Sequence, residues 1–158
     1  VGVYSILFEL ELYGGRMELL EVRTGMDLLK RAYDGALEPV CGRHGLTRME
    51  MDVLLFLANN PEMDTASALV SVRRLPKSHV SAAVNALAER GLIQREYRGG
   101  NRKTAHLCPT AAADAPIADG RAVQRKFGRT LTEGIAPEEL EQMLRTARRM
   151  VENIRREL

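Results

Sequence analysis

One stretch in the middle of the chain limits the possible folds more than any other, because it changes from helical to strand-like patterns within a short distance. Two short helical segments, residues 64–72 and 76–90, meet across a tight turn at a proline, which disfavours a helical residue before it but suits a new first turn. Strand-like segments at residues 92–97 and 103–107 then flank a turn rich in glycine and arginine. This order predicts a helix-turn-helix whose second helix leads directly into a β-hairpin.

A helix start stands just before this unit. Thr47 and Glu50 have the spacing of a capping box, in which each side chain bonds the backbone N–H of the other residue. Leu46 and Met51 flank the box and are placed to form a hydrophobic staple around it. We therefore expect a helix that begins at Thr47 and ends before Pro61.

Long helices are expected at both ends of the chain. Residues 17–41 and 137–158 each carry apolar residues at a repeating spacing of four and three, which indicates one stripe of a helix. The stripes are Val22, Met26, Leu29, Tyr33, Ala36 and Val40, and Leu140, Leu144, Ala147, Val151, Ile154 and Leu158. Gly42 is expected to end the first helix, and Pro116 and Gly120 to kink or delay a helix at residues 110–132. The predicted fold class is mainly α with a small β-hairpin, and such stripes pack inside a domain or between subunits.

The composition is that of an ordinary globular domain, with 45% hydrophobic and 28% charged residues among 158. It excludes disordered and collagen-like chains, and no apolar run approaches the roughly 20 residues of a membrane span. The two cysteines, Cys41 and Cys108, are too few and too far apart for the disulfide framework of a small secreted domain. We expect a reduced chain in the cytoplasm, with no membrane partner.

Residues 1–16 are interpreted as an N-terminal extension. Their apolar residues alternate with Glu9 and Glu11 and follow no basic cluster, which is not the layout of a signal peptide. The chain begins with valine, and Gly14-Gly15-Arg16 can be encoded by the purine-rich bases of a bacterial ribosome-binding site. We therefore expect Met17 to be the native start, which the intact mass of the natively expressed protein tests.

The charges are distributed unevenly along the chain. The whole chain has a formal net charge of +2, which by itself argues weakly against a nucleic-acid partner. Residues 71–106, however, hold eight Lys or Arg and two Glu, a net charge of +6, whereas the remainder holds 15 cations and 19 anions, a net charge of −4. A solvated basic face is the common explanation for such a run. Its coincidence with a helix-turn-helix and a hairpin favours a duplex-binding surface.

The second helix of this unit suits the major groove of B-DNA, which is about 12 Å wide and admits a helix. Side chains in its first turns reach base edges and phosphates, and the hairpin tip reaches the adjacent backbone or the minor groove. The candidate DNA-binding residues are Arg73, Arg74, Lys77, Ser78, His79, Ser81, Arg98, Asn101, Arg102 and Lys103. The alternative for His79 is a surface residue without a role.

These motifs together resemble the MarR family of bacterial winged helix-turn-helix regulators over nearly all of residues 17–158. The resemblance is carried by Leu46-Thr47-x-x-Glu50-x-x-Val53-Leu54, by Pro76-Lys77-Ser78-His79-Val80-Ser81, and by Leu87-Ala88-Glu89-Arg90-Gly91-Leu92-Ile93-Gln94-Arg95. It implies an obligate homodimer with interleaved terminal helices, which is why we assign the two apolar stripes to a subunit interface. It also implies a repressor of pseudo-palindromic operators that a small aromatic effector releases.

The resemblance divides the chain into an N-terminal dimerisation helix at residues 17–45, a winged helix-turn-helix lobe at 46–110 and C-terminal dimerisation helices at 111–158. The chain departs from the family pattern in the wing, where Asn101-Arg102-Lys103 stands in place of the usual Asp-x-Arg. The carboxylate that would orient the arginine is therefore absent, and lysine cannot make the planar bidentate contact of arginine. Wing geometry and operator sequence do not follow from the resemblance.

Other kinds of site have little support in the sequence. Cys41 with His44, and His106 with Cys108, are two separate pairs, whereas a zinc site needs three or four ligands. There is no phosphate loop, nucleophile elbow or pair of catalytic carboxylates, so we expect no enzyme, no metal and no cofactor. The candidates for an effector cleft are Met26, Tyr33 and Phe56, although such apolar residues more often belong to a core.

Two functions from different classes remain. The first is a dimeric, sequence-specific regulator that binds a double-stranded operator. The second is a helical protein-interaction dimer whose degenerate wing no longer binds DNA. A gel shift with the DNA upstream of the gene separates them.

Overall fold

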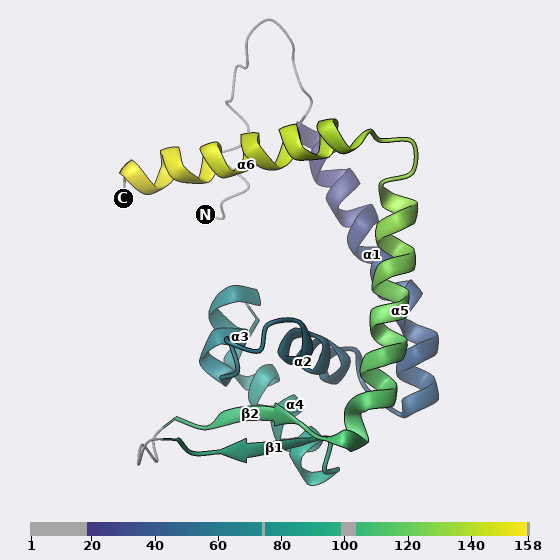
Figure 1. Cartoon of the computed structure of the whole chain (residues 1–158), viewed down its shortest axis with the longest axis vertical. Helices are drawn as coiled ribbons and strands as arrows, with labels where there is room; N and C mark the ends of the chain where they lie inside the picture. The colour runs from purple at the N-terminus through teal and green to yellow at the C-terminus, as the bar shows by residue number, and fades with distance from the viewer. Residues whose placement is uncertain (1–18, 74, 99–103, 158) are drawn as a thin grey trace, which may run out of the picture. The chain divides into compact units, whose positions relative to one another are not determined.

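The computed structural model describes residues 19–73, 75–98 and 104–157 (Figure 1). The predicted extension at residues 1–16 and the expected start at Met17 lie outside these described residues. The chain divides into two compact units, Val1–Val123 and Gln124–Leu158. The elements are α1 (Leu19–His44), α2 (Arg48–Asn59), α3 (Ala66–Arg73), α4 (Lys77–Glu89), β1 (Ile93–Glu96), β2 (His106–Pro109), a short 3-10 helix (Ala111–Ala113), α5 (Asp114–Leu131) and α6 (Pro137–Glu157). The predicted fold class, mainly α with a small β-hairpin, is confirmed.

The junction between α1 and α2 is fixed by a glycine and a capping box. The expected helix end at Gly42 is wrong, because α1 continues to His44 and the chain reverses at Gly45, whose φ of 60° suits a residue without a Cβ. The predicted capping box is present. Oγ1 of Thr47 accepts a hydrogen bond from the backbone N–H of Glu50 at 3.2 Å, and Oε2 of Glu50 accepts one from the backbone N–H of Thr47 at 2.8 Å.

The core of the first unit surrounds α2, against which α1, α4 and β2 all pack. This helix is buried on nearly every side, from Met51 through Leu57 except at Asp52. The other elements of the unit contribute Leu37, Val40 and Cys41 from α1, Leu69 from α3, Val80, Ala83, Val84 and Leu87 from α4, and Ile93 and Leu107 from the hairpin. Burying one large apolar side chain contributes about 1.5–3 kcal/mol, so α2 anchors the two helices and the hairpin that follow it.

The hairpin after α4 has shorter strands than the sequence predicts. β1 and β2 pair antiparallel, with Ile93 opposite Pro109. The predicted bounds of the return strand, residues 103–107, are wrong, because β2 begins at His106 and extends to Pro109. Burial of Ile93 and Leu107 on one face of the hairpin sets this register.

The first part of α5 packs closely on α2. A Cβ atom added to Gly120 would lie 2.9 Å from Cδ2 of Leu55 and 3.1 Å from Sδ of Met51, so only a glycine fits there without movement. The expected delay in this helix takes the form of the 3-10 turn at Ala111–Ala113, and α5 continues through Gly120 to its end at Leu131.

The second unit holds the end of α5 and all of α6. α6 begins at Pro137 as predicted, and Oε2 of Glu139 accepts a hydrogen bond from the backbone N–H of Ala136 at 2.9 Å. None of its residues is buried, and its exposed large apolar side chains are Met143, Leu144, Met150, Val151 and Ile154. Among the described helices, none combines the length and the apolar character that crossing a membrane requires.

Candidate nucleic-acid interface

α4 presents one face to the core and the opposite face to solvent. Val80, Val84 and Leu87 are buried, and the helix packs on α2 and α3. The solvent face exposes Lys77, Ser78, His79, Ser81, Ala82 and Asn85. Apart from Lys77 and His79 these side chains are short, so the helix can come close to a partner surface.

The N-terminus of α4 carries no side-chain cap. Pro76 occupies the N-cap position, and its carbonyl accepts a hydrogen bond from the backbone N–H of Val80 at 3.1 Å. The proline ring has no oxygen to offer to the N–H groups of Lys77 and Ser78, so the positive end of the helix dipole is open to an outside anion. The exposed Lys77 side chain adds a full positive charge at the same end. This arrangement suits a phosphate group.

α3 packs on α4 and is itself fixed by a cap at its N-terminus and by one buried leucine. Thr65 caps α3, because its Oγ1 accepts a hydrogen bond from the backbone N–H of Ala68 at 3.2 Å. Leu69 is fully buried in the core. The two helices are therefore fixed on either side of the predicted turn.

The predicted DNA-binding residues fall into three groups. Lys77, Ser78, His79 and Ser81 share the exposed first turns of α4. Arg74, Asn101, Arg102 and Lys103 lie outside the described residues, and of Arg73 only the backbone is described, as the last residue of α3. Arg98 follows β1 and joins a separate polar cluster.

The exposed face of α4 extends to two residues beyond the predicted DNA contacts, Asn85 on α4 itself and Arg95 on β1. Arg95 extends from β1, and its Nη2 donates a hydrogen bond to Oδ1 of Asn85 at 2.6 Å. Both side chains are exposed, and with Ser81 they line an open cavity between α3, α4 and the hairpin, whose lining also includes the apolar Val84 and Leu107. Asn85 lies seven residues after Ser78, two turns along one helix face, and that spacing could have identified it.

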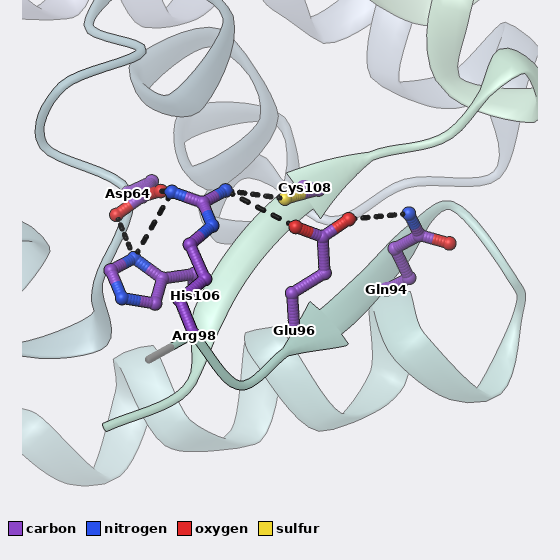
Figure 2. Close-up of polar contacts among 6 residues, drawn as sticks. All are labelled: Asp64, Gln94, Glu96, Arg98, His106 and Cys108. Atoms are coloured by element: carbon purple, nitrogen blue, oxygen red, sulfur yellow. Dashed lines mark hydrogen bonds and ion pairs between the residues drawn. The ribbon is translucent and has the colours of Figure 1, made fainter. Parts of the chain in front are cut away.

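The polar cluster that contains Arg98 joins the hairpin to the loop before α3 (Figure 2). Oδ1 of Asp64 lies 2.7 Å from Nδ1 of His106, and Oδ2 of Asp64 accepts a hydrogen bond from Nη1 of Arg98 at 2.9 Å. Nη2 of Arg98 donates to Oε2 of Glu96 at 3.2 Å and lies 3.5 Å from Sγ of Cys108. Only 9% of Asp64 is exposed, and burying a carboxylate without such partners would be costly.

The pKa values of the two acids reflect these partners. Burial raises the pKa of Asp64, but the hydrogen bond and charge of His106 and the guanidinium of Arg98 outweigh burial and leave that pKa below its usual range. The hydrogen bond from Arg98 likewise lowers the pKa of Glu96. Both acids are therefore charged at neutral pH, with the cation of Arg98 between them.

Arg90, another cation of the basic segment, has a structural role at the end of α4. Its guanidinium donates hydrogen bonds to the carbonyls of Gly45 at 2.9 Å and His44 at 3.0 Å, and Nη1 lies 3.7 Å from Oε2 of Glu50. These bonds tie the end of α4 to the junction between α1 and α2. The net charge of the segment therefore overstates the number of cations that face solvent freely.

The candidate effector residues lie in different environments. Met26 is 66% exposed on α1, whereas Phe56 is buried in the core. Tyr33 is half-buried, and its ring centroid lies 5.2 Å from the guanidinium carbon of Arg48. Arg48 in turn pairs with Asp34 and Asp52 at the interface of α1 and α2. The assignment of the three residues to one cleft stays a prediction.

The cysteines are both free thiols. Burial is the main reason that the pKa values of both Cys41 and Cys108 are raised, which disfavours a reactive thiolate at either position. Within the described part of the chain, no group of three or more His, Cys, Asp or Glu residues is arranged to hold a metal ion.

Comparison with known proteins gives a match to one family. Residues 44–103, which run from the end of α1 through the helix-turn-helix and into the hairpin, match the MarR family. No curated protein matches the chain.

Solved structures share the fold over most of the chain. A MarR-family transcriptional regulator from Listeria monocytogenes, solved with a 26mer DNA, is similar with a TM-score of 0.72 at 18% identity, covering 83% of this chain and 87% of that one. A MarR-family regulator from Silicibacter pomeroyi gives 0.68 at 24% identity, with 82% and 86% covered. The S. aureus MepR–DNA complex gives 0.67 at 18% identity, with 88% and 97% covered.

At these identities the structural similarity is evidence for the fold, and it extends well beyond the segment that matches by sequence. The sequence match supplies the family for the part of the chain that carries α2, α3, α4 and β1. Residues 44–103 therefore match the MarR family by sequence, and the chain shares its fold with solved structures of MarR-family transcriptional regulators.

Proposed function

We propose that the protein is a dimeric transcriptional regulator that binds double-stranded DNA in a sequence-specific manner. The observation that carries the proposal is the exposed face of α4, which combines an uncapped N-terminus with Lys77, Ser78, His79 and Ser81. The family match favours a regulator over an enzyme. DNA is bound in the solved complexes of the Listeria protein and of MepR, which have the same fold.

In this proposal α4 enters the major groove and the hairpin lies along the adjacent backbone. The open N-terminus of α4 and Lys77 hold a phosphate, whereas Ser78, His79 and Ser81 are placed to meet base edges. Arg95, oriented by Asn85, joins this surface from the side of β1. The wing residues Asn101, Arg102 and Lys103, with Arg73 and Arg74, are proposed as further phosphate contacts from the sequence.

A second copy of the chain is proposed to cover the apolar stripes. On α6 the side chains of Leu144, Val151 and Ile154 are 49%, 50% and 64% exposed and recur on one helix face. On α1 the side chains of Met26 and Leu29 are likewise exposed. A homodimer would bury these faces and present two α4 helices to half-sites about one helical turn of DNA apart.

We further propose that the protein represses its target genes and is released by a small aromatic effector that binds near Met26, Tyr33 and Phe56. The family resemblance supports repression, and the half-buried ring of Tyr33 between α1 and α2 supports the location. A panel of phenols and aromatic acids tests the idea by release of bound DNA.

The alternative function, a protein-interaction dimer without DNA binding, predicts no shifted duplex at any salt concentration.

The test starts with selection of a duplex from a random-sequence pool by the wild-type protein. Its affinity, measured by fluorescence anisotropy, should fall steeply with salt, because each neutralised phosphate releases condensed counterions. Lys77→Ala should weaken binding and flatten the slope of log K against log salt by roughly 1.8, because a dimer loses one phosphate contact of about 0.9 from each protomer. Lys126→Ala, which removes an exposed lysine of α5, is the matched control and should leave both unchanged. Failure to enrich any duplex, or a salt-independent affinity, would overturn the proposal.

A further inference from the structure

Asp64 is connected to the hairpin by its backbone as well as by its side chain. Its carbonyl accepts a hydrogen bond from the backbone N–H of Leu107 at 2.7 Å, and the next residue, Thr65, forms an isolated antiparallel bridge with His106. Its carboxylate holds His106 and Arg98 (Figure 2). The loop before α3 therefore acts as a short third strand beside β2.

The strand register gathers the other members of the cluster on one face of the hairpin. Gln94 lies opposite Cys108 and Glu96 opposite His106, and side chains two residues apart point to the same side. Figure 2 shows Arg98 continuing this row, with its guanidinium between the carboxylates of Asp64 and Glu96. The face that carries this row is the one turned away from the buried Ile93 and Leu107.

These contacts engage both terminal nitrogens of Arg98. Nη1 serves Asp64 and Nη2 serves Glu96. If Arg98 turned to a DNA phosphate, the buried carboxylate of Asp64 would lose a charged partner, and an incompletely paired buried charge is costly. The sequence predicts Arg98 to be a DNA contact, whereas its surroundings favour an internal role.

We infer that Asp64, Arg98 and His106 form a clamp that positions the hairpin on the helix-turn-helix, and that Arg98 is a positioning residue rather than a DNA contact. The inference rests on the proposed function. Arg98 and His106 lie in the sequence on either side of the proposed wing contacts at residues 101–103. By holding both residues, one buried carboxylate fixes the described ends of the hairpin at Arg98 and His106.

The clamp and a direct contact predict opposite effects for Asp64→Asn. This nearly isosteric change removes a negative charge close to the proposed DNA surface, so simple electrostatics predicts tighter binding to the selected duplex. The clamp predicts weaker binding, by at least about fivefold, because the hairpin loses its anchor and a neutral amide pairs less strongly than a carboxylate with the guanidinium of Arg98. Glu62→Gln removes an exposed carboxylate two residues away. As the matched control it should bind with equal or slightly higher affinity.

Arg98→Ala gives an independent measurement on an exposed side chain whose removal leaves the core intact. The clamp predicts an affinity loss similar to that of Asp64→Asn and a salt slope that changes by much less than the roughly 0.9 per lost phosphate contact. It also predicts that the double variant loses no more than either single variant, since both break the same contact. A slope lower by about 1.8 in Arg98→Ala, which is about 0.9 for each protomer of the dimer, or binding by Asp64→Asn as tight as that of the wild-type protein, would overturn the inference.

A measurement without DNA separates failure of this inference from failure of the proposed function. The clamp predicts faster hydrogen exchange at the amides of Leu107 and Cys108 in Asp64→Asn, with the amides of α2 unchanged. Unchanged exchange at both amides would contradict the clamp, whatever the protein binds. If the wild-type protein enriches no duplex but the exchange of Leu107 rises, the clamp stands and the proposed function fails.

Discussion

α4 and α6 are both amphipathic helices, but they differ in what covers their apolar faces. In α4 the side chains of Val80, Val84 and Leu87 are buried by α2 and α3 of the same unit. In α6 no residue is buried, although Leu144, Val151 and Ile154 recur with a similar spacing. An apolar stripe therefore predicts that a contact exists, but not whether the partner lies in the same chain.

The difference has an energetic consequence. Burial of the apolar face of α4 contributes to the free energy of folding of the first unit. The apolar face of α6 is exposed, so its burial can contribute only when α6 associates with a partner. Within α4, the buried face attaches the helix to the core, and the exposed face is the one proposed to bind DNA.

The largest effect on folding is expected from Leu87→Ala in α4. Leu87 is fully buried, and truncation of a buried leucine costs about 2–5 kcal/mol of the free energy of unfolding. Leu144→Ala in α6 is the matched change, and at protein concentrations below the dissociation constant of the proposed dimer it should cost less than about 0.5 kcal/mol. Urea unfolding followed by circular dichroism measures both, and equal losses at low concentration would show that α6 packs within its own chain.

The next effect concerns association. Ile154→Gln should weaken the homodimer by about 1.5–3 kcal/mol per protomer, the contribution of one buried isoleucine. Arg149→Gln alters the opposite side of α6, five residues earlier, and should leave the dimer intact. Sedimentation velocity over a range of concentrations reads the dissociation constant. A dimer that is indifferent to Ile154→Gln would remove α6 from the interface.

A smaller effect compares the two units within one helix, α5. Gly120→Ala places a methyl group 2.9 Å from Cδ2 of Leu55 and should destabilise the first unit by about 1–3 kcal/mol. A Cβ at Gly128 meets nothing within 4 Å, so Gly128→Ala should stabilise α5 by about 0.5–1 kcal/mol through its higher helix propensity. Thermal unfolding should therefore shift in opposite directions for the two variants.

The features that the sequence alone could predict are those whose causes lie within a few residues along the chain. Local signals identified the elements whose causes are local, such as the capping box of Thr47 and the start of α6 at Pro137. The end of α1 was misplaced at Gly42 because either of two nearby glycines can end a helix, and only the backbone shows that Gly45 adopts positive φ. The sequence also located the exposed face of α4, which follows from helical periodicity.

The Asp64 clamp could not be predicted, because it joins a loop to a hairpin 42 residues away in sequence. The alternation of Gln94, Glu96 and Arg98 was visible, but the partner strand was expected to begin at residue 103 instead of His106. With the return strand misplaced, the pairing of Gln94 with Cys108 and of Glu96 with His106 could not be predicted. The contact between Arg95 and Asn85 joins β1 to α4, and no local pattern in the sequence specifies which residue of a helix a strand residue meets.

The smallest expected effect is on stability in acid, and it compares a buried carboxylate with an exposed one. The pKa of Asp64 in the folded protein lies below its ordinary value of 3.8. Its charged form therefore stabilises the fold at pH values above 3.8, and this contribution is lost as the pH falls through the lower, folded-state pKa. Asp64→Asn should lack this contribution, so its free energy of unfolding should change less than that of the wild-type protein between pH 5 and pH 3.

Glu141 on α6 pairs with Arg145 at 2.7 Å, but its side chain is 71% exposed. An exposed pair of this kind contributes little, and Glu141→Gln should follow the wild-type profile. If the difference between the wild-type protein and Asp64→Asn stays constant over this pH range, the carboxylate is not a net stabilising partner of His106 and Arg98, and the contrast between buried and exposed pairs in the two units does not hold.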